Sequence, residues 1–187
     1  MKHKTTLIVR GGGDLASGVI HRLYKCGYQV LVLECAKPSA IRRRVSFGEA
    51  VYDGTSRVEG VTGRLIRDIS ECRKVWDEKE IPILVDENAD AVSELKPDAL
   101  IDAILAKKNL GTTRTMAPLT IGLGPGFTAL EDVDYVVETQ RGHNLARVIQ
   151  KGTAAPNTGI PGMIAGYGKE RVIHSPAAGM IHNYSEI

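Results

Sequence analysis

The sequence is poor in aromatic residues and cysteines, and it has no excess of charge of one sign. Aromatic residues make up only 5% of its 187 residues, which argues against a stacking surface for single-stranded nucleic acid. The formal net charge of +2 is too small to favour nucleic-acid binding. The three cysteines, Cys26, Cys35 and Cys72, are too few and too widely spaced for a disulfide framework or a zinc site. We therefore predict no nucleic-acid partner and no metal site.

Long apolar runs are also absent from the sequence. No segment approaches the ~20 apolar residues that span a bilayer. The first residues lead directly into a short apolar run, without the longer apolar stretch of a signal peptide. We expect a soluble, cytoplasmic protein with no membrane partner.

The common catalytic motifs are missing as well. The sequence has no Tyr-x-x-x-Lys pair, Walker lysine motif, Gly-x-Ser-x-Gly, His-Glu-x-x-His or Cys-x-x-Cys. The catalytic residues, if there are any, stay unknown at this point.

What the sequence does contain is an alternation of short apolar runs and helical patterns. Residues 7–9 form an apolar run, a helical pattern begins at Asp14, and Gly27 stands where that helix should end. Residues 30–33 form a second apolar run. A strand, a glycine turn, a helix and a second strand within ~30 residues are typical of a βαβ unit with parallel strands.

The alternation continues through most of the chain, where 43% of the residues are apolar. It predicts strands at residues 83–85, 99–104, 119–123 and 135–137, and helices at 68–80, 88–95 and 144–150. Residues 42–66 depart from it, and we expect residues 45–52 and 58–65 to pair as a small β excursion. The fold class is α/β, with a Rossmann-like, mainly parallel sheet and flanking helices over residues 1–170 and a small C-terminal β segment over 171–187.

The most specific motif is a dinucleotide-binding pattern that follows the first predicted strand and opens the first predicted helix. It consists of Gly11, Gly13 and Ala16, with Gly12 between the outer glycines. Gly11 permits a tight turn, Gly13 lets a pyrophosphate approach the backbone, and Ala16 allows close helix–strand packing. The helix N-terminus then offers N–H groups to an anion. The alternative is a glycine turn that only packs.

The same pattern includes an acidic residue about 20 positions further on. Glu34 directly follows the second apolar run, and we predict that it accepts hydrogen bonds from a ribose diol. Asp14 would repel a phosphate unless it caps the helix or points away. The three arginines at residues 42–44 either clamp an additional phosphate on the ribose or form a solvated basic surface.

Three further loops follow predicted parallel strands, at residues 107–113, 124–129 and 138–143. We therefore expect them to lie with residues 11–13 at one cleft on the carboxyl edge of the sheet. Two of these loops carry cationic side chains suited to a phosphate, and the last also has the residue types for acid–base chemistry. Plain turns are the alternative. Together the predicted cofactor-binding residues are Gly11, Gly12, Gly13, Asp14, Ala16, Glu34, Lys107, Asn109, Gly124, Gly126, Thr128, Glu138, Arg141 and His143.

Five segments in fixed order carry a resemblance to a known family: residues 8–18, 106–112, 124–129, 138–143 and 156–162. Together they closely resemble the YqeB-type accessory proteins of selenium-dependent molybdenum hydroxylase systems, over almost the whole chain. The resemblance implies a role in the maturation of molybdenum hydroxylases. The Rossmann-like part is similar to XdhC-type factors, which handle the molybdenum cofactor before insertion. The resemblance transfers no established catalytic residue.

Members of that family continue into a small β-rich module similar to a biotinyl-lipoyl sandwich. Residues 174–181 resemble its first strand, and the sequence ends at Ile187. A shortened version and an incomplete sequence are both left open.

The leading expectation is an accessory or maturation factor that binds a nucleotide-bearing ligand. The ligand would be a molybdopterin dinucleotide or an NAD(P)-type molecule, and the partner a molybdenum hydroxylase or its maturation machinery. One alternative is a free-standing NAD(P)-dependent oxidoreductase, and another is a protein–protein adaptor on a Rossmann scaffold. Homo-oligomer formation is left open.

Overall fold

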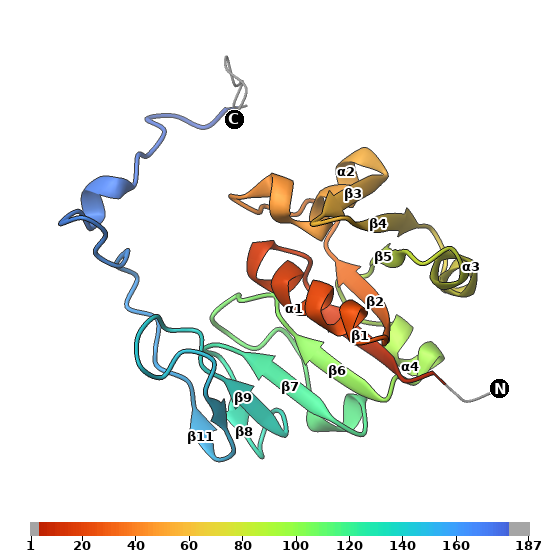
Figure 1. Cartoon of the computed structure of the whole chain (residues 1–187). Helices are drawn as coiled ribbons and strands as arrows, with labels where there is room; N and C mark the ends of the chain where they lie inside the picture. Colours follow the sequence, from red (N-terminus) through yellow and green to blue (C-terminus); the bar gives the residue numbers. More distant parts are fainter. Residues whose placement is uncertain (1–3, 180–187) are drawn as a thin grey trace. The chain divides into compact units, whose positions relative to one another are not determined.

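The computed structural model describes residues 4–179, and its course is drawn in Figure 1. The chain divides into two compact units, with the boundary between Pro156 and Asn157, whereas the sequence pattern places a boundary after residue 170. The second unit contains the 3-10 helix η5 (Lys169–Arg171) and an isolated bridge between Ile164 and Tyr167.

The first unit is built on a nine-stranded sheet in the order β10-β9-β7-β6-β1-β2-β5-β4-β3. Its strands are β1 (Thr6–Arg10), β2 (Gln29–Glu34), β3 (Thr55–Val58), β4 (Val61–Ile66), β5 (Ile81–Val85), β6 (Ala99–Asp102), β7 (Thr120–Leu123), β9 (Tyr135–Val137) and β10 (Val148–Ile149). All neighbours from β9 to β4 are parallel, and only the outermost strands β10 and β3 run antiparallel. The α/β fold with a mainly parallel sheet is confirmed, together with short β elements later in the chain, β8 (Thr128–Ala129) and β11 (Gly152–Thr153).

Short helices cover both faces of this sheet. They are α1 (Asp14–Lys25), α2 (Ala50–Asp53), α3 (Cys72–Asp77) and α4 (Ala91–Leu95), with the 3-10 turns η1 (Arg43–Val45), η2 (Phe47–Glu49), η3 (Ile69–Glu71) and η4 (Arg114–Met116). Among residues 4–179, no helix has both the length and the apolar character needed to cross a bilayer.

The alternation of side chains along each strand creates two cores. Val9 of β1 points to one face, where it belongs to a buried cluster with Ile20 of α1. Ile8 points to the other face, into a cluster with Val75 of α3. Figure 1 shows α1 lying across the central strands. The arrangement has the doubly wound form, in which the loops after the strands gather at one edge of the sheet.

Two local predictions are wrong. Residues 45–52 form η2 and α2 instead of a strand, and the antiparallel pair is β3 with β4. The predicted helix over residues 144–150 is also absent, since β10 pairs with β9 and the amide of Ala146 donates to the carbonyl of Glu138. Pairing with the edge strand replaces the helical hydrogen bonds. Of the strand predicted over residues 174–181, the part up to Gly179 is irregular, and Met180 and Ile181 lie outside the described residues.

A buried ion pair joins the ends of β1 and β6. The side chains of Arg10 and Asp102 are 3% and 2% exposed, with 3.5 Å between Nη1 and Oδ2. Thr112 lies between them, because its hydroxyl accepts from Arg10 Nη1 at 2.6 Å and donates to Asp102 Oδ2 at 2.6 Å. Arg10 also donates to the carbonyl of Glu87 at 2.9 Å. The guanidinium is therefore surrounded by acceptors, as a buried charge requires.

Removal of Asp102 should lower the stability of the fold, because it leaves a buried charge without its partner. In Asp102→Ala the Arg10 guanidinium stays buried without its carboxylate, and we expect the free energy of unfolding to fall by about 3–5 kcal/mol in urea denaturation. The matched control is Asp77→Ala, which breaks an exposed i,i+4 pair with Arg73 and should cost less than about 0.5 kcal/mol. Equal small losses in the two variants would contradict the role given to the buried pair.

Candidate functional site

The loops that follow β1, β6, β7 and β9 lie along one edge of the sheet, because these strands are parallel neighbours. Each of these loops also contacts the next one along the edge. A Cβ atom at Gly11 would lie 2.9 Å from the Cα of Ile104, and one at Gly126 would lie 2.7 Å from the Cα of Lys108. A Cβ at Gly124 would lie 2.6 Å from the hydroxyl of Thr139. The predicted site residues thus share an edge, and their binding of a ligand stays a prediction.

Residues 11–13, named here the glycine loop, pack tightly against the chain on one side. Gly11 has φ +90° and donates its N–H to the carbonyl of Leu33 at 2.7 Å. The carbonyl of Gly12 accepts from the amide of Gly48 at 2.8 Å and from the hydroxyls of Ser46 and Ser17 at 2.7 and 3.1 Å. The segment around residues 46–48 therefore holds the loop in place, a contact that the sequence pattern does not reveal.

Gly13 differs from the other two glycines because it is open. A Cβ atom there would meet nothing within 4 Å. Gly13 is the N-cap of α1 in an extended conformation, and no side chain caps the helix from this position. Three residues on, Ala16 is 1% exposed and packs in the core beneath the loop. The amino end of this 12-residue helix keeps the geometry that suits an anion.

Glu34 lies beside the glycine loop, as its place after β2 predicts. One carboxylate oxygen accepts from the amide of Gly12 at 2.6 Å, and the other accepts from the amide of Cys35 at 2.8 Å. In this state the carboxylate holds the protein's own backbone. Each oxygen retains a second lone pair that can accept a further hydrogen bond. The bonds from a ribose diol stay a prediction.

Asp14 forms an ion pair with Arg42, the first of the three arginines at residues 42–44. Its Oδ2 lies 2.6 Å from both Nε and Nη2 of Arg42, and Oδ1 accepts from the amide of Leu15 at 2.9 Å. Arg43 pairs instead with Glu49 and lies over the ring of Tyr52, 5.7 Å from its centroid. Two of the three arginines therefore have partners within the protein.

The loop after β6 is shaped by Asn109. Its side-chain oxygen accepts from the amides of Gly111 and Thr112 at 2.9 and 2.8 Å, and its amide group donates to the carbonyl of Thr112 at 2.8 Å. Asn109 thus holds the Thr112 hydroxyl in the buried network of Arg10. Lys107 precedes it at φ +62° and is exposed.

The loop after β7 is a tight turn with two glycines. Gly124 and Gly126 have φ of +78° and +115°, which only glycine adopts without strain. Thr128 is half-buried at the start of β8, and its amide donates to Asp132 at 2.7 Å. These glycines let the turn approach the loops on either side.

Glu138 is buried and braces the loop after β9. Its carboxylate accepts from the amides of Gln140 at 2.7 Å and Ala155 at 2.8 Å. Burial alone would raise the pKa of Glu138, but the N–H groups of Ala155, Gln140 and Thr139 outweigh it and hold the pKa below its usual value. Glu138 is therefore a positioning residue in this structure.

Arg141 and His143 follow Glu138 and are both exposed. Their position beyond β9 puts them on the same edge as the glycine loop. Within the described residues 4–179, no group of three or more His, Cys, Asp or Glu side chains is arranged to hold a metal ion.

Comparison with known proteins gives one curated relative. The chain is 51% identical over 177 residues to "Uncharacterized protein YqeB" of Escherichia coli (strain K12), an alignment that covers 95% of this chain and 33% of that protein. The chain thus spans about a third of the length of the curated relative it matches. No family model matches the chain, and no solved structure matches it. The identity supports the resemblance to YqeB-type proteins.

The glycines of the loop should differ in their tolerance of a side chain. A Cβ at Gly12 would lie 2.8 Å from the amide nitrogen of Gly48, so Gly12→Ala should lower the free energy of unfolding by about 1–3 kcal/mol. Gly13→Ala meets open space and should cost less than about 1 kcal/mol, the usual difference between N-cap residues. Thermal and urea unfolding of the two variants give the comparison. A greater loss for Gly13→Ala would refute this packing.

Glu138 should make stability depend on pH in the acid range. Because its pKa is lowered on folding, the carboxylate stabilises the fold above the ordinary Glu pKa of about 4.3, and this stabilisation is lost as the pH falls toward the folded-state pKa. Glu138→Gln cannot accept with both terminal atoms and should cost about 1–3 kcal/mol at neutral pH. We expect the difference from wild type to shrink below pH ~4, as measured by urea denaturation across pH. A difference that is constant with pH would contradict the assignment.

Proposed function

We propose that this chain binds a nucleotide-bearing ligand at its glycine loop and acts as an accessory factor in the maturation of molybdenum hydroxylases. The ligand class is a dinucleotide, either a molybdopterin dinucleotide or an NAD(P)-type molecule. The partner is a molybdenum hydroxylase or its maturation machinery. The binding part rests on the geometry of the edge, and the biological role rests on the resemblance to YqeB-type accessory proteins.

The observation that carries the binding proposal is the contrast between Gly12 and Gly13. Gly11 and Gly12 are required by the protein's own packing, since a side chain at either would strike backbone. Gly13 has no such requirement: its Cβ position is open, and it stands at the N-cap of α1, where it has no side chain to cap the helix. A ligand pyrophosphate over the helix amides would account for a glycine at this position.

The electrostatics of the edge suit a phosphate-rich ligand. Asp14 would oppose an anion, but Arg42 offsets its charge through the ion pair at 2.6 Å. Lys107, Arg141 and His143 stand exposed on neighbouring loops, and none of them forms an ion pair within the part of the chain that the structure describes. Cations on separate loops can form charge-assisted hydrogen bonds with separate phosphates of a dinucleotide.

The ribose end of the ligand is assigned to Glu34. Its carboxylate lies 2.6 Å from the Gly12 amide, at the position where an acidic side chain meets a ribose diol in dinucleotide-binding folds. A 2′-phosphate would instead favour Arg44, which makes no ion pair among residues 4–179. We therefore propose that Glu34 binds the ribose diol and that the ligand carries no 2′-phosphate.

Calorimetry with NAD and NADP tests the binding site. Gly13→Val should keep the fold, because its side chain meets open space, but it should block the pyrophosphate and weaken NAD binding by about 10- to 150-fold, as expected from the loss of charge-assisted hydrogen bonds. The matched control is Gly18→Val, further along α1, where a Cβ also meets nothing within 4 Å. The control should bind as wild type does.

Other outcomes select among the functions. Unchanged affinity in Gly13→Val would show that the glycine loop is structural only. A clear preference for NADP would overturn the Glu34 assignment in favour of the arginines. Turnover of a nicotinamide would select a free-standing oxidoreductase, and ligand-independent binding to a hydroxylase would select an adaptor. Mass spectrometry of the small molecule that copurifies with the chain identifies the dinucleotide.

A further inference from the structure

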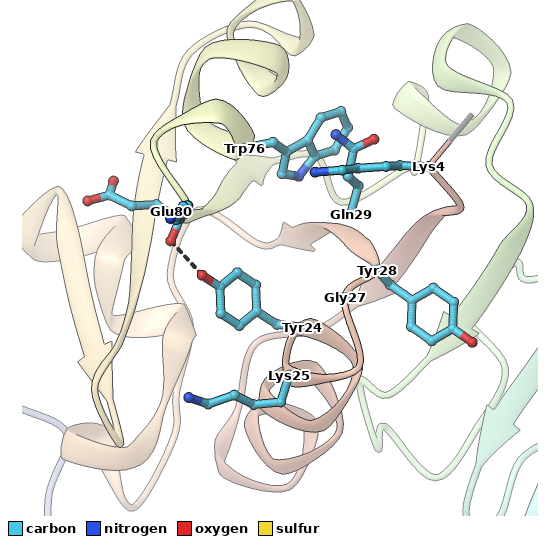
Figure 2. A pocket seen from close by; sticks show the side chains of 9 residues that line it. Lys4, Tyr24, Lys25, Gly27, Tyr28, Gln29, Trp76 and Glu80 are labelled. Atoms are coloured by element: carbon cyan, nitrogen blue, oxygen red, sulfur yellow. Dashed lines mark hydrogen bonds between the residues drawn. The ribbon is translucent and has the colours of Figure 1, made fainter. Parts of the chain in front are cut away.

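A pocket lies at the opposite edge of the sheet from the glycine loop. It has a volume of about 290 Å³ and is lined by Lys4, Tyr24, Lys25, Gly27, Tyr28, Gln29, Trp76, Lys79 and Glu80. These residues stand where β1, β2 and β5 begin and where α1 and α3 end. Because those strands are parallel, the length of the strands separates the pocket from the loops at their carboxyl ends. Figure 2 shows it from close by.

Two aromatic rings form walls that are already fixed in place. The hydroxyl of Tyr24 donates to the carbonyl of Lys79 at 2.7 Å, drawn as a dashed line in Figure 2. The indole N–H of Trp76 donates to the carbonyl of Val30 at 2.9 Å. Their polar atoms are satisfied within the protein, so the rings present apolar faces. Rings held in this way lose little conformational entropy when a ligand binds.

Positively charged side chains outnumber negatively charged ones in the lining of the pocket. Lys4 precedes β1, Lys25 ends α1 and Lys79 follows α3. None of them forms an ion pair within residues 4–179. The one carboxylate in the lining, Glu80, is engaged by Arg64 at 2.5 Å. The ammonium groups are therefore left without a carboxylate partner, and an anion at this place would meet attraction from several sides.

Gln29 adds a neutral group to the same wall. In Figure 2 its side chain lies on the same side of the pocket as Lys4 and Trp76, while Tyr28 turns away from Tyr24. The side-chain amide of Gln29 makes no hydrogen bond to the described part of the chain, although it can both donate and accept. The pocket thus combines flat apolar walls, an unused amide and a cationic rim.

We propose that this pocket binds a small planar aromatic ring that bears a carboxylate or a phosphate. The ring lies against Tyr24 and Trp76, and the anion is held by Lys25 and Lys79. The pocket volume is close to the lower end of the range for small-molecule sites, roughly 300 Å³, which suits one aromatic acid or one mononucleotide and not a dinucleotide. This site is independent of the glycine loop and of the function proposed for it.

Trp76 makes the test specific, because it is the single tryptophan of the chain and it lines this pocket. Its fluorescence is followed while 4-hydroxybenzoate or adenosine 5′-monophosphate is titrated into the full chain, with phenol and adenosine as the matched neutral compounds. We expect saturable quenching by at least one of the two anions, weaker at high salt, and much weaker quenching by its neutral counterpart. The anion that binds shows whether a carboxylate or a phosphate is preferred.

The double variant Lys25→Gln/Lys79→Asn removes two charges and keeps the backbone. Lys79 has φ +60°, and asparagine tolerates that conformation. We expect about tenfold weaker binding of the anion, from two partly exposed charge contacts. The matched control is Lys96→Asn/Lys151→Gln, which changes net charge equally outside the pocket, with Lys96 at φ +49°.

Three results would overturn the proposal: no saturable quenching by either anion, equal quenching by the neutral compounds, or equal affinity in the two double variants. Circular dichroism of the variants confirms that each keeps its fold before the affinities are compared. Failure of NAD to bind at the glycine loop has no bearing on these outcomes, because the reporter and the variants belong to the opposite edge of the sheet.

Discussion

The backbone at residues 11 and 12 touches other segments of the chain at distances that only glycine permits. At Gly11 the neighbour is the backbone of residues 103–104, and at Gly12 it is the backbone of Gly48. The end of β1 is thereby joined to the loop after β6 on one side and to the segment before α2 on the other. The edge of the sheet depends on these contacts, because they hold the loop after β6 and the segment before α2 against the glycine loop.

The buried pair of Arg10 and Asp102 lies next to these backbone contacts, because Arg10 precedes Gly11 and Asp102 precedes Ala103. With the glycine loop turned sharply away, the Arg10 side chain lies under the loops, where Thr112 and backbone carbonyls supply the acceptors that water would supply outside. Asn109 shapes the turn that presents Thr112. A buried charge with so many partners specifies one arrangement of the edge, since any other would leave the guanidinium unsatisfied.

The two edges of the sheet have different characters. At the carboxyl edge, the carboxylates of Glu34 and Glu138 hold backbone amides, and the exposed cations stand on loops. At the amino edge, fixed aromatic rings stand beside lysines that no carboxylate of the described residues balances. A parallel sheet produces this separation, because all loops after strands lie on one side and all loops before strands lie on the other.

The alternation of apolar runs was enough to predict the parallel sheet, the βαβ unit of residues 7–33 and the sharing of one edge by the four loops. These features depend on local periodicity and on the parallel direction of strands that a helix connects, both of which the order of residues carries. Residues 45–52 and 144–150 were not predictable in this way, because their conformations depend on Gly12, Ser17 and Glu138, which are distant in sequence or belong to another strand. The same holds for the partners of Glu34, Asp14 and Arg10. The sequence by itself determined which side chains stand at the ends of the strands, whereas only the tertiary structure decided which of them bind the protein's own backbone and which stay exposed, because hydrogen-bond partners and burial are set by long-range packing.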